Sequence, residues 1–113
     1  MKIAIIGSRK IDHVDLEELV PKGATEIISG GAGGVDALAE RYALAHRLLL
    51  TVFRPDYRRF RKGAPLKRNL QIVDEADEVI AVWDGESRGT KFTIDYAYQK
   101  KKLLLLKIVC PKG

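Results

Sequence analysis

Five short apolar segments, separated by longer amphipathic ones, constrain the fold of this chain most strongly. They are residues 2–6, 25–29, 48–53, 78–83 and 103–109. Runs of this length that are rich in Ile, Val and Leu predict strands buried on both faces of a sheet. Strands that alternate with helices pair in parallel through right-handed crossovers. The pattern therefore predicts an α/β domain with a five-stranded parallel sheet in the order 3-2-1-4-5 and helices on both faces.

The segments between these strands carry helix signals. Helices are expected at residues 12–20, 35–48, 65–76 and 91–102, with a loop at 54–65. Asp12 is the expected N-cap of the first helix, and Pro65 suits the first position of the third. The inward face of the third helix is expected to carry Leu66, Leu70, Val73 and Ala76.

Length and composition narrow the class of protein. At 113 residues, one domain spanning residues 1–113 is expected, with a core of useful size. A single cysteine excludes an internal disulfide framework. The apolar runs are too short to span a bilayer, and no signal-peptide pattern precedes them, so a cytoplasmic protein without a membrane partner is expected. One Asn, two Gln and one Met beside 20 Lys and Arg are typical of a heat-adapted source.

Glycine and serine gather at one predicted edge of the sheet. Eight of the ten glycines lie between a strand and the next helix: Gly7, Gly30, Gly31, Gly33, Gly34, Gly63, Gly85 and Gly89. In a parallel sheet these connections meet at the carboxyl edge, where α/β proteins bind ligands. Both residue types favour turns in general, but the connections at the opposite edge are nearly free of them. We therefore expect a ligand site at the carboxyl edge.

The segment 29–36, with the sequence SGGAGGVD, is the strongest single motif. It leads from the second strand into a helix and contains Gly30, Gly31, Gly33 and Gly34. Such a turn lets the backbone approach a ligand, and the following helix directs N–H groups and its positive dipole end at the same space. This chemistry suits a phosphate, although neither GxGxxG nor the Walker A pattern is present. Asp36 either stabilises the helix dipole or accepts a hydrogen bond from a ribose hydroxyl.

Two further connections are expected to border the same site. Gly7, Ser8 and Arg9 follow the first strand, and an Arg at this place suits bidentate contact with a phosphate. Gly85, Gly89 and Thr90 precede the last helix. There Thr90 is expected to cap a second helix N-terminus with its hydroxyl.

The start of the third helix contributes Arg68 and Asn69. Arg68 is expected near the phosphate site. Asn69, the only Asn in the chain, is expected near the inward face of its helix. A partly buried amide needs hydrogen-bond partners, so Asn69 is either a ligand contact or a structural residue that holds a neighbouring loop.

A basic segment leads into the same helix. Between residues 54 and 68, seven basic residues accompany Asp56 alone, an excess of six against a net +5 for the whole chain. The seven are Arg54, Arg58, Arg59, Arg61, Lys62, Lys67 and Arg68. Tyr57 and Phe60 lie among them, and cations interleaved with aromatic rings suit phosphates and stacked bases. We expect either a patch for single-stranded nucleic acid or a solvated loop.

Catalytic constellations are not recognisable in the sequence. It contains no metal-ligand spacing of His, Cys and Asp, and no Ser–His or Cys–His arrangement. No catalytic residue and no metal ligand is therefore expected. A protein that only binds its ligand needs neither.

Taken together, the motifs resemble the SLOG superfamily of Rossmann-like proteins, and most closely its small YspA-like members. The resemblance rests on IIGSR at 5–9, ISGGAGGVDALAERYA at 28–43, KRN at 67–69 and DEVIAVWDGESRGT at 77–90. It implies a sensor or carrier of a nucleotide or nucleotide-derived phosphate ligand, with no other cofactor. The positions that carry over are Gly30, Gly31, Gly33, Gly34, Asp36, Arg68, Asn69, Gly89 and Thr90, with Ser8 and Arg9 matching the first motif.

Related families imply two rival functions. The LOG phosphoribohydrolases cleave a base from a nucleoside monophosphate and carry P-G-G-x-G-T with carboxylates just after the Thr. Residues 84–86 here are Asp-Gly-Glu, and Lys91 follows Thr90, so the expected Glu is missing and only Glu86 or Asp95 lies near enough to replace it.

The second rival is the DNA-processing protein DprA (Smf), which binds single-stranded DNA. It shares the S-G-x-A-x-G-x-D turn, the R-N pair and the S-x-G-T turn, and the basic segment favours its function. A homodimer is compatible with so small a domain.

Overall fold

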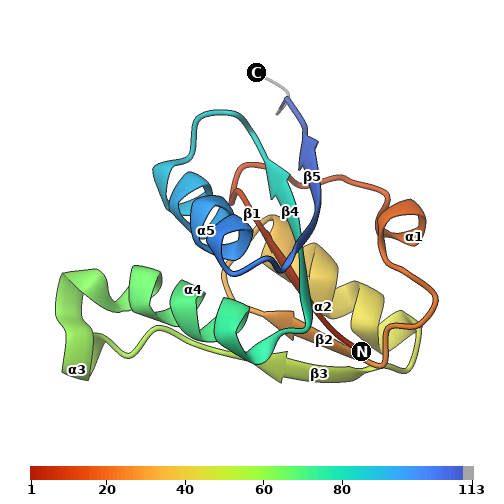
Figure 1. Cartoon of the computed structure of the whole chain (residues 1–113), viewed down its shortest axis with the longest axis horizontal. Coiled ribbons are helices and arrows are strands. Elements are labelled where there is room, and N and C mark those ends of the chain that lie inside the picture. Colours follow the sequence, from red (N-terminus) through yellow and green to blue (C-terminus); the bar gives the residue numbers. More distant parts are fainter. Residues whose placement is uncertain (111–113) are drawn as a thin grey trace.

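A five-stranded sheet forms the centre of the protein (Figure 1). The computed structural model describes residues 1–110. Its strands are β1 (Lys2–Gly7), β2 (Glu26–Ser29), β3 (Leu49–Val52), β4 (Glu78–Trp83) and β5 (Leu103–Ile108). They lie in the order β3-β2-β1-β4-β5, and each adjacent pair is parallel. The predicted strand order and direction are confirmed, and the fold is a Rossmann-like α/β fold.

Helices cover both faces of this sheet. They are α1 (Leu16–Leu19), α2 (Val35–Ala45), α3 (Tyr57–Phe60), the 3-10 turn η1 (Arg61–Gly63), α4 (Ala64–Glu75) and α5 (Arg88–Gln99). In β1, Ile3 and Ile5 point to a core shared with α1 and α2, whereas Ala4 and Ile6 point to a core shared with α4 and α5. This alternation is that of any strand buried on both faces. No helix among residues 1–110 is long and apolar enough to cross a bilayer.

The first helix is shorter than predicted, and the expected cap at Asp12 is wrong. Helix α1 begins at Leu16, and the Asp15 side chain accepts a hydrogen bond from the Glu17 N–H at 3.0 Å. The preceding residues have another role: the Ile11 N–H donates to the Ser8 carbonyl oxygen, and the Ile11 side chain is buried in the core. That contact holds residues 8–14 as a loop along the sheet.

The segment 54–65 was predicted to be a loop, but it contains α3 and η1. The Asp56 side chain caps α3 by accepting a hydrogen bond from the Arg59 N–H at 3.2 Å. Helix α4 begins at Ala64, so Pro65 is its second residue. Its inward face is confirmed in part: Val73 and Ala76 are buried, but Leu66 is exposed, and Ala64, Arg68 and Ile72 are buried instead. Arg68 lies on the inward face because its guanidinium donates a hydrogen bond to the buried carbonyl oxygen of Gly30.

Helix α5 begins at Arg88, three residues before the predicted start. Ser87 is its N-cap, so Gly89 and Thr90 belong to the first turn, and the prediction that Thr90 caps the helix is wrong. The Ser87 and Thr90 hydroxyl oxygens lie 3.2 Å apart. The helix ends at Gln99, which leaves Lys100–Lys102 in the connection to β5.

Candidate functional site

A cleft of about 410 Å³ opens at the carboxyl edge of the sheet, between the ends of β1 and β4. The chain proceeds from β1 to β2 and β3 on one side, and to β4 and β5 on the other. Open α/β sheets bind ligands at such a switch point. The first turns of α4 and α5 form two of its walls, and the connection after β1 forms another.

Eight of the thirteen predicted ligand residues line this cleft. They are Gly7, Ser8, Arg9, Asp36, Arg68, Asn69, Gly89 and Thr90. The other five, Gly30, Gly31, Gly33, Gly34 and Gly85, lie outside its lining. Sequence analysis missed Lys10, Ala32, Pro65, Leu66, Asp84, Ser87 and Thr93, together with Ile6 and Ile72 on the floor. Most of these residues lie within a few positions of a predicted one. Closeness in the sequence to a predicted residue could therefore have identified them.

The glycine turn before α2 is a joint between two parts of the backbone. Gly34 has φ +64°, and a Cβ there would lie 2.5 Å from the carbonyl oxygens of Ser8 and Arg9. The Val35 N–H donates to that same Ser8 carbonyl at 3.3 Å. The Val35 N–H at the start of α2 is therefore hydrogen-bonded within the protein and is not free for a ligand. The close approach that requires glycine here is to the β1 connection.

Arg68 lies at the centre of a buried polar network beneath the cleft. Its guanidinium donates to the carbonyl oxygen of Gly30, and its Nε donates to Asn69 Oδ1 at 2.7 Å. The Asn69 amide donates to Thr93 Oγ1 at 2.9 Å, and Thr93 donates to the Gly89 carbonyl at the same distance. This network joins the end of β2 to α4 and α5.

Asp36 lies beside Arg68 and is also buried. Burial raises the pKa of Asp36, while the hydrogen bond from the Ala32 N–H and the Arg68 charge act in the opposite direction. Burial likewise lowers the pKa of Arg68, and the Asp36 charge opposes that shift. Each ion thus compensates part of the desolvation cost of the other. Both residues line the cleft.

The turn between β4 and α5 is held by its own hydrogen bonds. Asp84 Oδ1 accepts from the N–H groups of Ser87 at 2.8 Å and Glu86 at 2.9 Å, and these bonds lower the pKa of Asp84. Ser8 Oγ accepts from the Asp84 N–H at 3.2 Å. Trp83 Nε1 donates to the Ser87 carbonyl at 3.0 Å. These contacts fix the start of α5 relative to β1 and β4.

The first turn of α5 is the part of the cleft best suited to an anion. First-turn N–H groups have no acceptors within their own helix, and Ser87 makes no side-chain capping bond here. At Gly89 a Cβ would meet no heavy atom within 4 Å, so the backbone borders open space. Arg9 and Lys10 lie exposed on the same cleft. A phosphate at this place would meet both N–H groups and positive charge.

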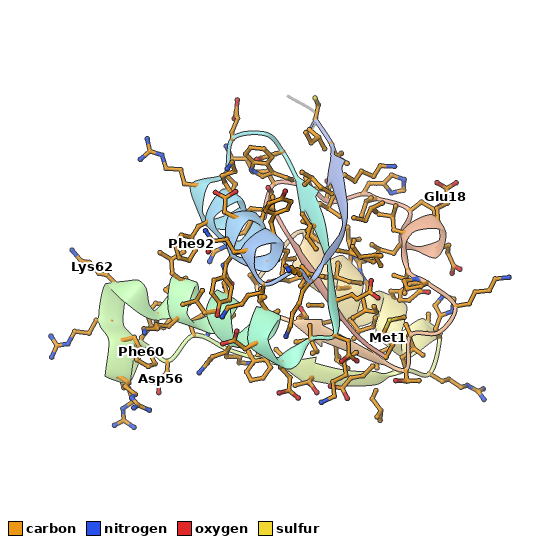
Figure 2. All side chains as sticks on the ribbon, in the orientation of Figure 1. Met1, Glu18, Asp56, Phe60, Lys62 and Phe92 are labelled. Carbon is orange, nitrogen blue, oxygen red and sulfur yellow. The ribbon has the colours of Figure 1, made fainter. Side chains whose placement is uncertain are left out.

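The basic segment forms a separate surface beyond the start of α4. Helix α3 and η1 project from the body of the protein, and Lys62 of η1 points away from it (Figures 1 and 2). Arg59 and Lys67 lie 5.2 and 5.7 Å from the centre of the Phe60 ring, whereas Tyr57 is 56% exposed. Except for Arg68, the cations of this segment lie outside the cleft lining. The predicted patch and the cleft are thus two neighbouring surfaces.

The two carboxylates considered for hydrolysis have different places. Glu86 lines the cleft, whereas Asp95 lies outside it and pairs with Lys91 Nζ at 2.7 Å. Among residues 1–110, no three His, Cys, Asp or Glu side chains come together as a metal site requires.

Comparisons of the chain with protein-family models, with curated proteins and with solved structures give no match. The site is therefore interpreted from its own geometry.

Proposed function

We propose that this protein binds a nucleotide, or a phosphate-bearing nucleotide derivative, in the cleft between β1 and β4. The observation that carries the proposal is the place of Gly89: it lines the cleft within the first turn of α5, and a Cβ there would meet no atom of another part of the chain within 4 Å. A phosphate at this turn would accept N–H hydrogen bonds and would face Arg9 and Lys10.

The remainder of the cleft suits the rest of such a ligand. Pro65 and Leu66 provide apolar surface in the same cleft as the polar start of α5, and a base would pack there. The volume of about 410 Å³ lies within the usual range for small-molecule sites. The proposed role is that of a sensor or carrier. Hydrolysis of the ligand would require Glu86, the cleft carboxylate named for it above, as acid or base.

Fluorescence of Trp83 provides the test. This residue is the only Trp in the chain and is bonded to Ser87, the N-cap of α5. We expect one of AMP, ADP, ATP, ADP-ribose or NAD to change its emission saturably, with weak dependence on salt. Adenosine is the matched control without phosphate and should bind more weakly. Absence of binding to every phosphate compound, by fluorescence and by calorimetry, would refute the proposal.

A second candidate function is binding of single-stranded nucleic acid by the basic segment. The supporting observation is that its cations other than Arg68 are exposed, while the one acid, Asp56, is occupied as the cap of α3. The half-exposed ring of Tyr57 is available for stacking. Such binding would weaken steeply as salt rises, because phosphate contacts release counterions.

Replacement of Arg58, Arg59 and Lys62 together by Glu separates the two candidates. The triple variant should lose binding of an oligonucleotide and keep binding of the mononucleotide. An oligonucleotide affinity that survives these substitutions would exclude the basic segment as its site.

A further inference from the structure

Strand β5 leaves an unusually apolar edge exposed. Among residues 1–110, β4 is its only neighbour in the sheet (Figure 1). Leu104, Leu105, Leu106 and Ile108 are 46%, 36%, 41% and 60% exposed. Consecutive residues of a strand point to opposite faces, so apolar surface is exposed on both sides of this strand. Among the six residues of β5, only Lys107 carries a charge.

The free backbone groups of β5 belong to the same residues. The Val109 N–H donates to the Trp83 carbonyl of β4, and backbone direction alternates along a strand. Residues 105 and 107 therefore also direct their N–H and C=O groups toward β4. Both lie after the register irregularity between Val79 and Ile80. Leu106 and Ile108, which lie beyond that irregularity, direct theirs outward. An unpaired edge of this kind is a template for another strand.

The opposite edge of the sheet does not share these properties. Strand β3 has four residues, against six in β5, and one of them is Thr51. Its hydroxyl donates to the Glu26 side chain of β2 at 2.9 Å. Natural edge strands are commonly blunted by shortness or by inward or edge charges. Strand β3 is blunted by its shortness, whereas β5 is longer and carries one charge, Lys107.

We infer that β5 pairs with β5 of a second copy of this chain, antiparallel about a two-fold axis at Leu106. In antiparallel pairs, residues whose backbone groups face each other exchange two hydrogen bonds. An axis at Leu106 sets Leu106 against its own copy and Leu104 against Ile108 of the other copy. This register uses both residues whose backbone groups face outward, Leu106 and Ile108. The two sheets then form one continuous sheet.

Charge favours a second copy in this orientation. The start of β5 follows the basic residues Lys100–Lys102, and its end lies beside the turn that holds Asp84 and Glu86, since Trp83 pairs with Ile108. An antiparallel two-fold arrangement places the basic end of one copy toward the acidic end of the other. Lys107 then lies opposite Leu105 rather than opposite another cation. Parallel pairing of two copies would be head-to-tail and would lack this closure.

The test is the oligomeric state of the full chain and of matched Leu→Lys variants. We expect the wild-type chain to sediment at twice the monomer mass at micromolar concentration. Leu106→Lys sets two like charges on the axis and should weaken the dimer at least about tenfold. Leu44→Lys is the control, because Leu44 is 71% exposed on α2 and remote from β5. A monomeric wild type, or a dimer insensitive to Leu106→Lys, would overturn the inference.

Cysteine cross-linking tests the register without relying on a charged variant. In a Cys110→Ser background, Leu106→Cys should form an intermolecular disulfide on mild oxidation, because directly opposed residues lie about 5.5 Å apart at Cα, within disulfide range. Leu104→Cys should not, because the two Leu104 residues would lie about 13 Å apart. Cross-linking at position 104 and not at 106 would contradict the proposed axis.

Discussion

Arg68 on α4 donates a hydrogen bond from its guanidinium to the carbonyl oxygen of Gly30 at the end of β2. A Cβ on Gly30 would lie 2.7 Å from the same guanidinium nitrogen. The close approach of Arg68 thus explains why residue 30 is a glycine. The Arg68 guanidinium is in turn largely engaged in hydrogen bonds within the protein. Both residues support the cleft from below.

Replacement of Arg68 by Lys should destabilise the protein. Lys lacks the planar fork that reaches both Gly30 and Asn69, so one buried acceptor stays unpaired, at a cost of about 1–3 kcal/mol. Urea unfolding measures this loss. Arg41→Lys, on the exposed side of α2, is the control and should change stability by less than about 0.5 kcal/mol. Equal effects of the two variants would show that the network contributes little.

Adjacent glycines of the turn before α2 should respond differently to alanine. Gly34→Ala places a Cβ against two carbonyl oxygens at 2.5 Å and in a left-handed conformation, so a loss above about 1–2 kcal/mol is expected. Gly33 has neither constraint, and Gly33→Ala should leave stability within about 0.5 kcal/mol. Thermal unfolding of both variants measures the two losses of stability. A tolerated alanine at position 34 would contradict the described joint.

Gly89→Ala should separate binding from stability. The added methyl group meets no protein atom within 4 Å, and alanine is favoured over glycine within a helix by roughly 0.5–1 kcal/mol. The variant should therefore unfold no earlier than wild type. If a phosphate approaches the first turn of α5, the same methyl group should weaken nucleotide binding about tenfold or more, or about 1.4 kcal/mol. Unchanged affinity would move the phosphate away from this turn.

Asp84 is expected to make part of the protein's stability sensitive to acid. Its pKa is lowered in the folded state, so its ionised form stabilises the fold above the ordinary Asp value, and this contribution disappears as pH falls below the folded pKa. Asp84→Asn keeps an acceptor oxygen for the turn but removes the charge. The variant should be less stable than wild type near pH 7, by about 1 kcal/mol or less because the group is exposed to solvent.

Unfolding measured from pH 7 to pH 2 tests the sign of this effect. The difference between wild type and Asp84→Asn should shrink as Asp84 becomes protonated at low pH. A difference that grows with acid would contradict the hydrogen bonds assigned to Asp84.

Local signals located the strands and the carboxyl-edge residues but misplaced helix ends. The apolar runs predicted all five strands to within a residue or two, because burial on both faces leaves little freedom in residue type. Asp12 was the expected cap of the first helix, but Asp15 caps α1. The buried place of Ile11, which removes Asp12 from α1, depends on a core that no local pattern describes.

Arg68 shows the same limit within the candidate site. Its neighbours along the chain suggested a free phosphate contact, but its acceptor is a carbonyl 38 residues away in the sequence. The glycines of the turn before α2 were likewise predicted to face a ligand, whereas Gly34 faces the backbone of the β1 connection. A sequence shows which residues tolerate close approach and does not show what approaches them.

The α/β class, the parallel order of five strands and the edge at which glycine residues gather can be read from the chain alone. These features follow from the periodicity of apolar residues and from the geometry of crossovers, both of which are local. Which glycine borders open space, which acceptors Arg68 binds and which edge strand stays exposed become visible only in the folded protein. Those depend on side chains far apart in the chain, whose contacts arise only when the two cores have packed on the sheet.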